Sequence, residues 1–259
     1  MPGNITESLK VWDLPTRVFH WMLALLVFAN FFTGEDEGGL LIVHTYCGYL
    51  IGLLLIARVA WGVAGNRHAR FGDFLKPWSE TREYLRQLLR LSPPRYVGHN
   101  PLGGWMIVVM LVTLGLIVFT GMAAAVGEGV RIPFLGGLPD GVSEASEEIH
   151  EVAATVMMVL AGLHVIGVLG DWLLTGENII KAMVTGRKTP AEGVAPAPAI
   201  SAWRGAVLAA FVLLGTGWMI DQTRFENVDN EHEEHEKQHD EEDEEEDEDD
   251  HHERYDDDD

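Results

Sequence analysis

The sequence contains a single cysteine, Cys47, among its 259 residues, and it has no CxxCH motif. A disulfide bond within the chain is therefore excluded, and so is covalent attachment of a c-type haem, which needs two cysteines beside a histidine. Basic residues are also scarce, with 18 Lys and Arg against 40 Asp and Glu and a formal net charge of −22. Such an excess of negative charge repels nucleic acid, so we expect no nucleic-acid partner.

The negative charge lies almost entirely at the C-terminal end. Residues 226–259 contain 22 acidic and 2 basic residues, a charge of −20, which leaves −2 for residues 1–225. A segment with this charge and almost no apolar side chains cannot bury enough surface to fold alone. We therefore expect a disordered acidic tail, which also carries the histidines at 232, 235, 239, 251 and 252.

Five apolar runs are long enough to cross a membrane, at about 14–33, 40–61, 102–125, 149–174 and 203–220. The first run is not a signal peptide, because it lacks a small-residue cleavage site and has Arg17 and His20 near its start. The sequence therefore predicts an all-α integral membrane protein in contact with lipid.

Positive charge alternates between the connections of these runs. Three segments are basic. Lys10 and Arg17 lie before or at the start of the first run, and Arg67, Arg70, Lys76, Arg82, Arg86, Arg90 and Arg95 lie between the second and third runs. Lys181, Arg187, Lys188 and Arg204 lie between the fourth and fifth runs. The other two connections are acidic: Glu35, Asp36 and Glu37; Asp140, Glu144, Glu147 and Glu148, opposed by Arg131. Basic connections stay in the cytoplasm, so we expect a cytoplasmic N-terminus and an external acidic tail.

Four histidines lie inside the apolar runs: His20, His44, His150 and His164. His150 and His164 are roughly 21 Å apart along one helix and leave it within about 40° of the same direction. Both rings should then point into the bundle, one near each membrane surface. His44 should lie at the same depth in the membrane as His150, near the outer surface. His20 should lie at the same depth as His164, near the inner surface.

Two facing imidazoles at each depth suit bis-histidine ligation of haem iron. One alternative to haem ligation is that each histidine only forms a hydrogen bond with a neighbouring helix. A second alternative is zinc binding. Zinc prefers a compact tetrahedral site, however, and neither pair has a cysteine or carboxylate on the same inner face. We favour two non-covalent haem b groups.

Several motifs together resemble the bacterial cytochrome b561 and Ni,Fe-hydrogenase b-type cytochrome subunit family. They are VWDLPTRVFHW (11–21), HTYCGYLIGLLLIARVAWG (44–62), HARF (68–71), YVGHNPLGG (96–104) and EIHEVAATVMMVLAGLHV (148–165). The resemblance covers about residues 10–188. It implies an inner-membrane four-helix bundle with two b haems, one held by His20 and His164 and the other by His44 and His150. It also implies that electrons pass between a quinone pool and a partner at the outer surface.

The sequence predicts three parts: a dihaem four-helix membrane bundle at 1–190, a linker and fifth transmembrane helix at 191–225, and the acidic tail at 226–259. The fifth run and the tail lie outside the family core. Arg17 and Arg58 are cations on the cytoplasmic side. They either pair with haem propionates or only fix the orientation of the chain in the membrane. The tail is a solvated polyanion, a docking site for a basic electron carrier, or a loose divalent-metal binder.

The sequence thus predicts transmembrane electron transfer between quinone and a periplasmic redox partner, with a c-type cytochrome as the favoured partner. It leaves open whether the chain itself is a quinone oxidoreductase. One alternative is an electron-conducting membrane anchor for a specific redox enzyme such as a hydrogenase. Another is a metal-binding membrane protein that uses the acidic tail.

Overall fold

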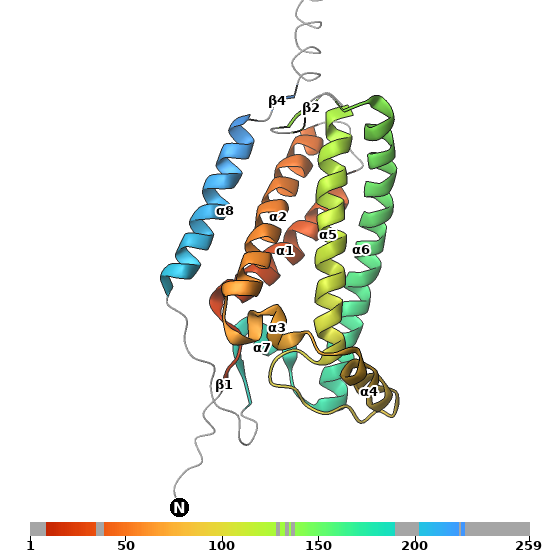
Figure 1. Ribbon diagram of the computed structural model, residues 1–259, viewed down its shortest axis with the longest axis vertical. Coiled ribbons are helices and arrows are strands. Elements are labelled where there is room, and N and C mark those ends of the chain that lie inside the picture. Colours follow the sequence, from red (N-terminus) through yellow and green to blue (C-terminus); the bar gives the residue numbers. More distant parts are fainter. Residues whose placement is uncertain are drawn as a thin grey trace, which may run out of the picture.

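The computed structural model describes residues 9–34, 39–127, 130–132, 135, 138–189, 202–222 and 224–225. Within this part the fold is helical, with five helices long and apolar enough to cross a membrane (Figure 1). The expected all-α membrane architecture is confirmed. The linker before the fifth helix and the acidic tail lie outside the described residues.

The five long helices are α1 (Leu14–Thr33), α2 (Gly39–Ala64), α5 (Pro101–Gly127), α6 (Asp140–Thr175) and α8 (Ala202–Gln222). Two of them begin at caps that the sequence carries. The carboxylate of Asp13 accepts a hydrogen bond from the Thr16 amide at the start of α1, and Asn100 does the same for Gly103 at the start of α5. A side chain that satisfies a free amide of the first turn fixes where a helix begins.

Helix α6 is longer than its apolar run predicts. It begins at Asp140, after Pro139, and contains 36 residues, or about 54 Å at 1.5 Å per residue. The glutamates assigned to a connection by the sequence therefore lie on the first turns of this helix. Small residues permit the extension, because Ser143 and Ser146 are buried and Ser143 packs where Gly127 of α5 has no side chain.

Helix α5 packs along the length of α6, whereas α2 contacts α1, α5 and α8. In Figure 1, α8 lies on the opposite side of α2 from the α5–α6 pair. A buried cluster of Ile51, Leu114 and Met157 joins α2, α5 and α6 in the middle of the bundle. Val212 of α8 is buried against a second cluster that contains Phe19 and Leu54.

The short elements divide between the two ends of the bundle (Figure 1). The basic end, as we call it, carries β1 (Leu9–Lys10), η1 (Arg67–Ala69), α3 (Phe71–Phe74), α4 (Trp78–Leu89), α7 (Ile179–Thr185) and β3 (Arg187–Lys188). The acidic end carries β2 (Val130–Arg131), β4 (Arg224–Phe225) and the start of α6. Strand β1 pairs with β3, and β2 pairs with β4, both antiparallel. These two-residue strands were not predicted, because pairs so short leave no periodic signal in the sequence.

Candidate functional site

At the acidic end, His44 of α2 faces His150 of α6. The two ring centres are 6.0 Å apart. Nδ1 of His44 lies 3.1 Å from the Asn30 carbonyl oxygen, and Nδ1 of His150 lies 2.8 Å from that of Ile117. A carbonyl can only accept a hydrogen bond, so each Nδ1 carries the proton and each Nε2 keeps its lone pair for a metal.

At the basic end, His20 of α1 faces His164 of α6, with ring centres 6.2 Å apart. His20 also contacts the edge of Trp21 at 4.9 Å. Its Nδ1 atom is buried and has no hydrogen-bond partner among the described residues. The four histidines therefore meet in the two pairs that their depths predict.

The spacing of each pair suits two imidazoles on opposite sides of one iron. A metal–imidazole bond is about 2.0–2.1 Å long, and the ring centre lies about 1.1 Å behind the nitrogen, so ring centres across one metal are roughly 6 Å apart. Among the described residues, no group of three or more His, Cys, Asp or Glu side chains is placed to hold a metal ion. Two facing imidazoles are the side-chain set with which proteins ligate a b-type haem.

The region between the two pairs is apolar. Met157 lies seven residues from each α6 histidine and is buried against Ile51 and Leu114. Large hydrophobic side chains at this level exclude water from the centre of the bundle.

The two candidate arginines occupy different surroundings. Arg17 donates a 2.6 Å hydrogen bond to the Val184 carbonyl of α7, and its Nε atom is buried without a partner. Arg58 is buried, at 7% exposure, and donates to the Ala69 carbonyl at 3.3 Å. Its guanidinium lies 5.5 Å from the centre of the Phe71 ring. Within the described residues, neither arginine forms an ion pair, so both retain donors for an anionic group.

Several buried polar atoms near the basic-end histidines have no hydrogen-bond partner within the part of the chain that the structure describes. They are Trp12 Nε1, Thr16 Oγ1, Arg17 Nε, His20 Nδ1 and His99 Nδ1. An unsatisfied buried polar atom costs about 1–3 kcal/mol, and such a group calls for a partner. Polar groups of a bound cofactor or substrate, such as haem propionates or quinone oxygens, fit this set chemically.

His99 precedes α5 and packs between Trp12 and Phe74, with ring centres 4.5 and 5.1 Å away. Burial, together with the charges of Arg58 and Lys188, lowers its pKa to about 3. His99 is therefore a neutral imidazole at physiological pH.

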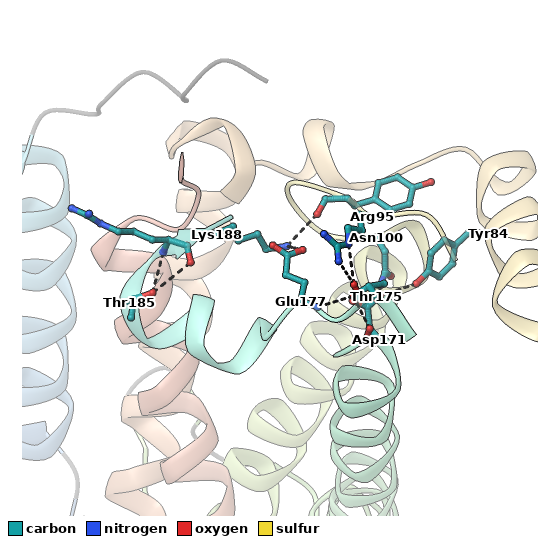
Figure 2. A network of polar contacts seen from close by, with 10 residues as sticks. Tyr84, Arg95, Asn100, Asp171, Thr175, Glu177, Thr185 and Lys188 are labelled. Carbon is teal, nitrogen blue, oxygen red and sulfur yellow. Dashed lines mark hydrogen bonds and ion pairs between the residues drawn. The ribbon is translucent and has the colours of Figure 1, made fainter. Parts of the chain in front are cut away.

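A polar network surrounds the end of α6 at the basic end (Figure 2). The carboxylate of Asp171 accepts hydrogen bonds from the Tyr84 hydroxyl at 3.1 Å and from the Asn100 amide at 3.2 Å. Lys188, with a side chain only 4% exposed, lies 3.5 Å from the Glu177 carboxylate. The network ties α4, the segment before α5, the end of α6 and β3 together.

Most of the groups that position the histidines could not be predicted from the sequence. The carbonyls of Asn30 and Ile117 have no sequence signature, because any residue can supply a carbonyl. Asn30 nevertheless gave a usable signal: an amide inside an apolar run is costly and marks a functional position. The network around Lys188 joins segments far apart in the chain and could not be inferred from spacing.

Comparisons with known proteins identify the family of the chain. The family described as Prokaryotic cytochrome b561 matches residues 11–186. A protein named Probable Ni/Fe-hydrogenase B-type cytochrome subunit from Cupriavidus necator is 27% identical over 225 residues, covering 72% of this chain and 89% of the relative. Proteins of the same name from Rhizobium leguminosarum bv. viciae and Rhodobacter capsulatus are 26% and 25% identical, each over 70% of this chain and over 89% and 82% of the relative. No solved structure matches the chain.

The matched region contains the four long helices that carry or support the histidine pairs, whereas α8 lies beyond it. The family implies haem b and electron transport. The chain belongs to the prokaryotic cytochrome b561 family, which includes the Ni/Fe-hydrogenase b-type cytochrome subunits.

Proposed function

We propose that this protein carries electrons across the membrane through two b haems, one held by His20 and His164 and the other by His44 and His150. The observation that carries this proposal is the pair of ring-to-ring distances, 6.2 and 6.0 Å, at opposite ends of the bundle. Haem would supply one-electron redox chemistry when bound, and each histidine pair would hold one haem.

Residues of the chain itself orient the imidazole rings and exclude water from the region between the two sites. The carbonyls of Asn30 and Ile117 orient His44 and His150, and second-shell bonds of this kind raise the basicity of the ligand nitrogen. The apolar layer around Met157 separates the two sites.

Single alanine substitutions of the four histidines test the ligand pairs. Each variant should fall from two haems per chain toward one. The His20→Ala and His164→Ala variants should lose the same component of a redox titration, and the His44→Ala and His150→Ala variants should lose the other. His68→Ala is the control, because His68 interacts with Asp73 and should leave both haems. Loss of one component by a mismatched pair, such as His20 and His150, would refute the assignment.

We further propose that quinone exchanges electrons with the basic-end haem. The unpaired polar atoms of Trp12, Thr16 and His99 gather there, and Arg58 brings a buried positive charge. A quinone analogue should shift the midpoint potential of the haem held by His20 and His164. The shift should be lost in the Arg58→Gln and His99→Phe variants, whereas a shift confined to the other haem would place the quinone at the acidic end.

The orientation of the chain follows from its charge. We propose a cytoplasmic basic end and a periplasmic acidic end, because basic connections stay inside. Helix α6 then projects into the periplasm, and four of its exposed glutamates, Glu144, Glu147, Glu148 and Glu151, follow helical i, i+3, i+4 and i+7 spacing next to His150. Within the described residues none of the four is in an ion pair, so they present a negative surface beside the outer site.

The names of the relatives favour a redox enzyme as the external partner over a small c-type cytochrome. Gentle purification of the full chain should therefore retain a large metalloenzyme. Rapid electron exchange with an isolated basic c-type cytochrome, without any co-purifying enzyme, would support the carrier alternative instead.

A further inference from the structure

A hollow of about 410 Å³ opens at the basic end where α2 ends and α8 begins. Its lining includes Arg67, Arg70 and Arg204, together with the last residues of α2, Val63 and Ala64. The volume falls within the range of about 300–1,000 Å³ that is typical of small-molecule sites. Arg204 belongs to α8, outside the region that matches the family, so the hollow combines the family core with the additional helix.

The three arginines give this hollow an excess of positive charge. Arg67 pairs with Asp73 at 3.2 Å, and Arg204 donates a 3.5 Å hydrogen bond to the Ala64 carbonyl. Arg70 is exposed, and its guanidinium has no partner among the residues that the structure describes. Asp73 thus offsets the charge of one of the three lining arginines. Planar guanidinium donors suit the oxygens of a phosphate.

Apolar side chains continue from the hollow along the bundle. Val63 is 71% exposed, Val59 lies one helical turn deeper on α2, and Val207 lies one turn deeper than Arg204 on α8. Trp203, beside Arg204, is 63% exposed and stands where aromatic residues anchor a helix at the membrane interface. A cationic hollow above an apolar surface matches an amphiphile, with its phosphate among the arginines and its acyl chains along the valines.

We propose that this arginine hollow binds the phosphate of an anionic phospholipid and that the lipid bridges α8 to α2. Basic pockets between transmembrane helices on the cytoplasmic side are suited to acidic lipid headgroups. Besides the hydrogen bond of Arg204 to the Ala64 carbonyl, α8 contacts α2 through apolar side chains such as Leu53, which lies against Gly215. A headgroup held by Arg70 and Arg204 adds an ionic link at the end where α8 enters the membrane.

The test uses the full-length haem-loaded protein in neutral detergent. Phosphatidylglycerol should remain bound in native mass spectrometry and raise the melting temperature, whereas phosphatidylcholine should do neither. The double variant Arg70→Gln/Arg204→Gln should bind phosphatidylglycerol about thirtyfold more weakly, since each cation near an anionic lipid contributes a factor of about five. Its haem content and its melting temperature in phosphatidylcholine should equal those of the unmodified protein, which shows that it folds.

The matched control is Arg82→Gln/Arg90→Gln, which removes two exposed arginines of α4 and its C-cap at the same end of the molecule. It should bind phosphatidylglycerol like the unmodified protein. An equal loss in this control would mean that general electrostatic attraction accounts for binding and would overturn the proposal. Equal stabilisation by inorganic phosphate alone would also overturn it, because the ligand would then be a free anion. An undiminished affinity of the Arg70→Gln/Arg204→Gln variant for phosphatidylglycerol would overturn the proposal as well.

Discussion

Gly121 leaves the Ile117 carbonyl open to the ring of His150. Gly121 and Ile117 are one helical turn apart on α5. The His150 Nδ1 atom lies 2.8 Å from the Ile117 carbonyl oxygen. A Cβ atom at Gly121 would lie 2.6 Å from Cε1 of the histidine ring. The orientation of one histidine of the acidic-end pair therefore depends on a missing side chain in the neighbouring helix.

Gly121→Ala should displace the His150 ring and lower the occupancy of the haem at the acidic end. Overpacking of this kind costs about 1–3 kcal/mol, and the ring would also lose its hydrogen bond to Ile117. The measurement is haem content per chain with a redox titration. Gly162→Ala on α6 is the matched control, because nothing lies within 4 Å of its added Cβ. Two full-occupancy haems in Gly121→Ala would contradict this account.

Glu177→Gln should destabilise the basic end. The side chains of Lys188 and Glu177 are 4% and 14% exposed, and removal of one partner from a buried ion pair costs roughly 3–5 kcal/mol. The control Glu83→Gln breaks the surface pair with Arg86, whose two side chains are about half exposed, and should cost less than about 1 kcal/mol. Equal losses of unfolding free energy in the two variants would show that the Lys188 pair is not important for stability.

The cost of Glu177→Gln should also depend on pH. Burial lowers the pKa of Lys188, and Glu177 opposes that shift, so the variant lowers this pKa further. A lysine with a folded-state pKa below its unfolded value destabilises the fold while it is protonated, and the penalty disappears as pH rises toward the unfolded value. The difference in unfolding free energy between variant and unmodified protein should therefore shrink from pH 7 to pH 10.

His99→Phe should make the protein less sensitive to acid. The pKa of His99 is lowered to about 3, so above pH 6.5 the ring is neutral in both folded and unfolded states. As pH falls from 6.5 toward 3, only the unfolded state gains the proton and stability is lost, by about 2 kcal/mol at pH 5. Phenylalanine keeps the ring contacts with Trp12 and Phe74 and has no proton to gain. Unfolding free energies at pH 7.5 and pH 5.0 measure the effect, and an identical acid loss in both proteins would contradict it.

Deletion of residues 226–259 should slow electron exchange with a basic protein at low salt. The segment carries a charge of −20, and a field of this strength accelerates the encounter with a cation by tenfold or more, roughly, at low ionic strength. Stopped-flow reduction of a small basic c-type cytochrome at 10 mM and 300 mM salt measures the effect. The truncated protein should show a weaker salt dependence with unchanged haem content. An unchanged salt dependence would assign the attraction to the α6 glutamates instead.

Hydropathy located the five long helices in the sequence, because a membrane span needs about twenty apolar residues whatever its neighbours are. Helical geometry placed His150 and His164 on one face at two depths, and this limited their partners to His20 and His44. The start of α6 was missed because a helix outside the membrane needs no apolar run. Ser143 and Ser146, packed on α5, support it instead.

The sequence by itself determined the number of spans, the depth of each histidine and the distribution of charge between the two ends, since these depend on local composition and the fixed rise of a helix. Only the tertiary structure decided which carbonyls orient His44 and His150, why α5 has a glycine at position 121, and how Lys188 meets Glu177. Those features depend on contacts between distant segments, and contacts of a few ångströms are set by the packing of whole helices. The arginine hollow has the same origin, because Arg70 and Arg204 become neighbours only when α8 packs against α2.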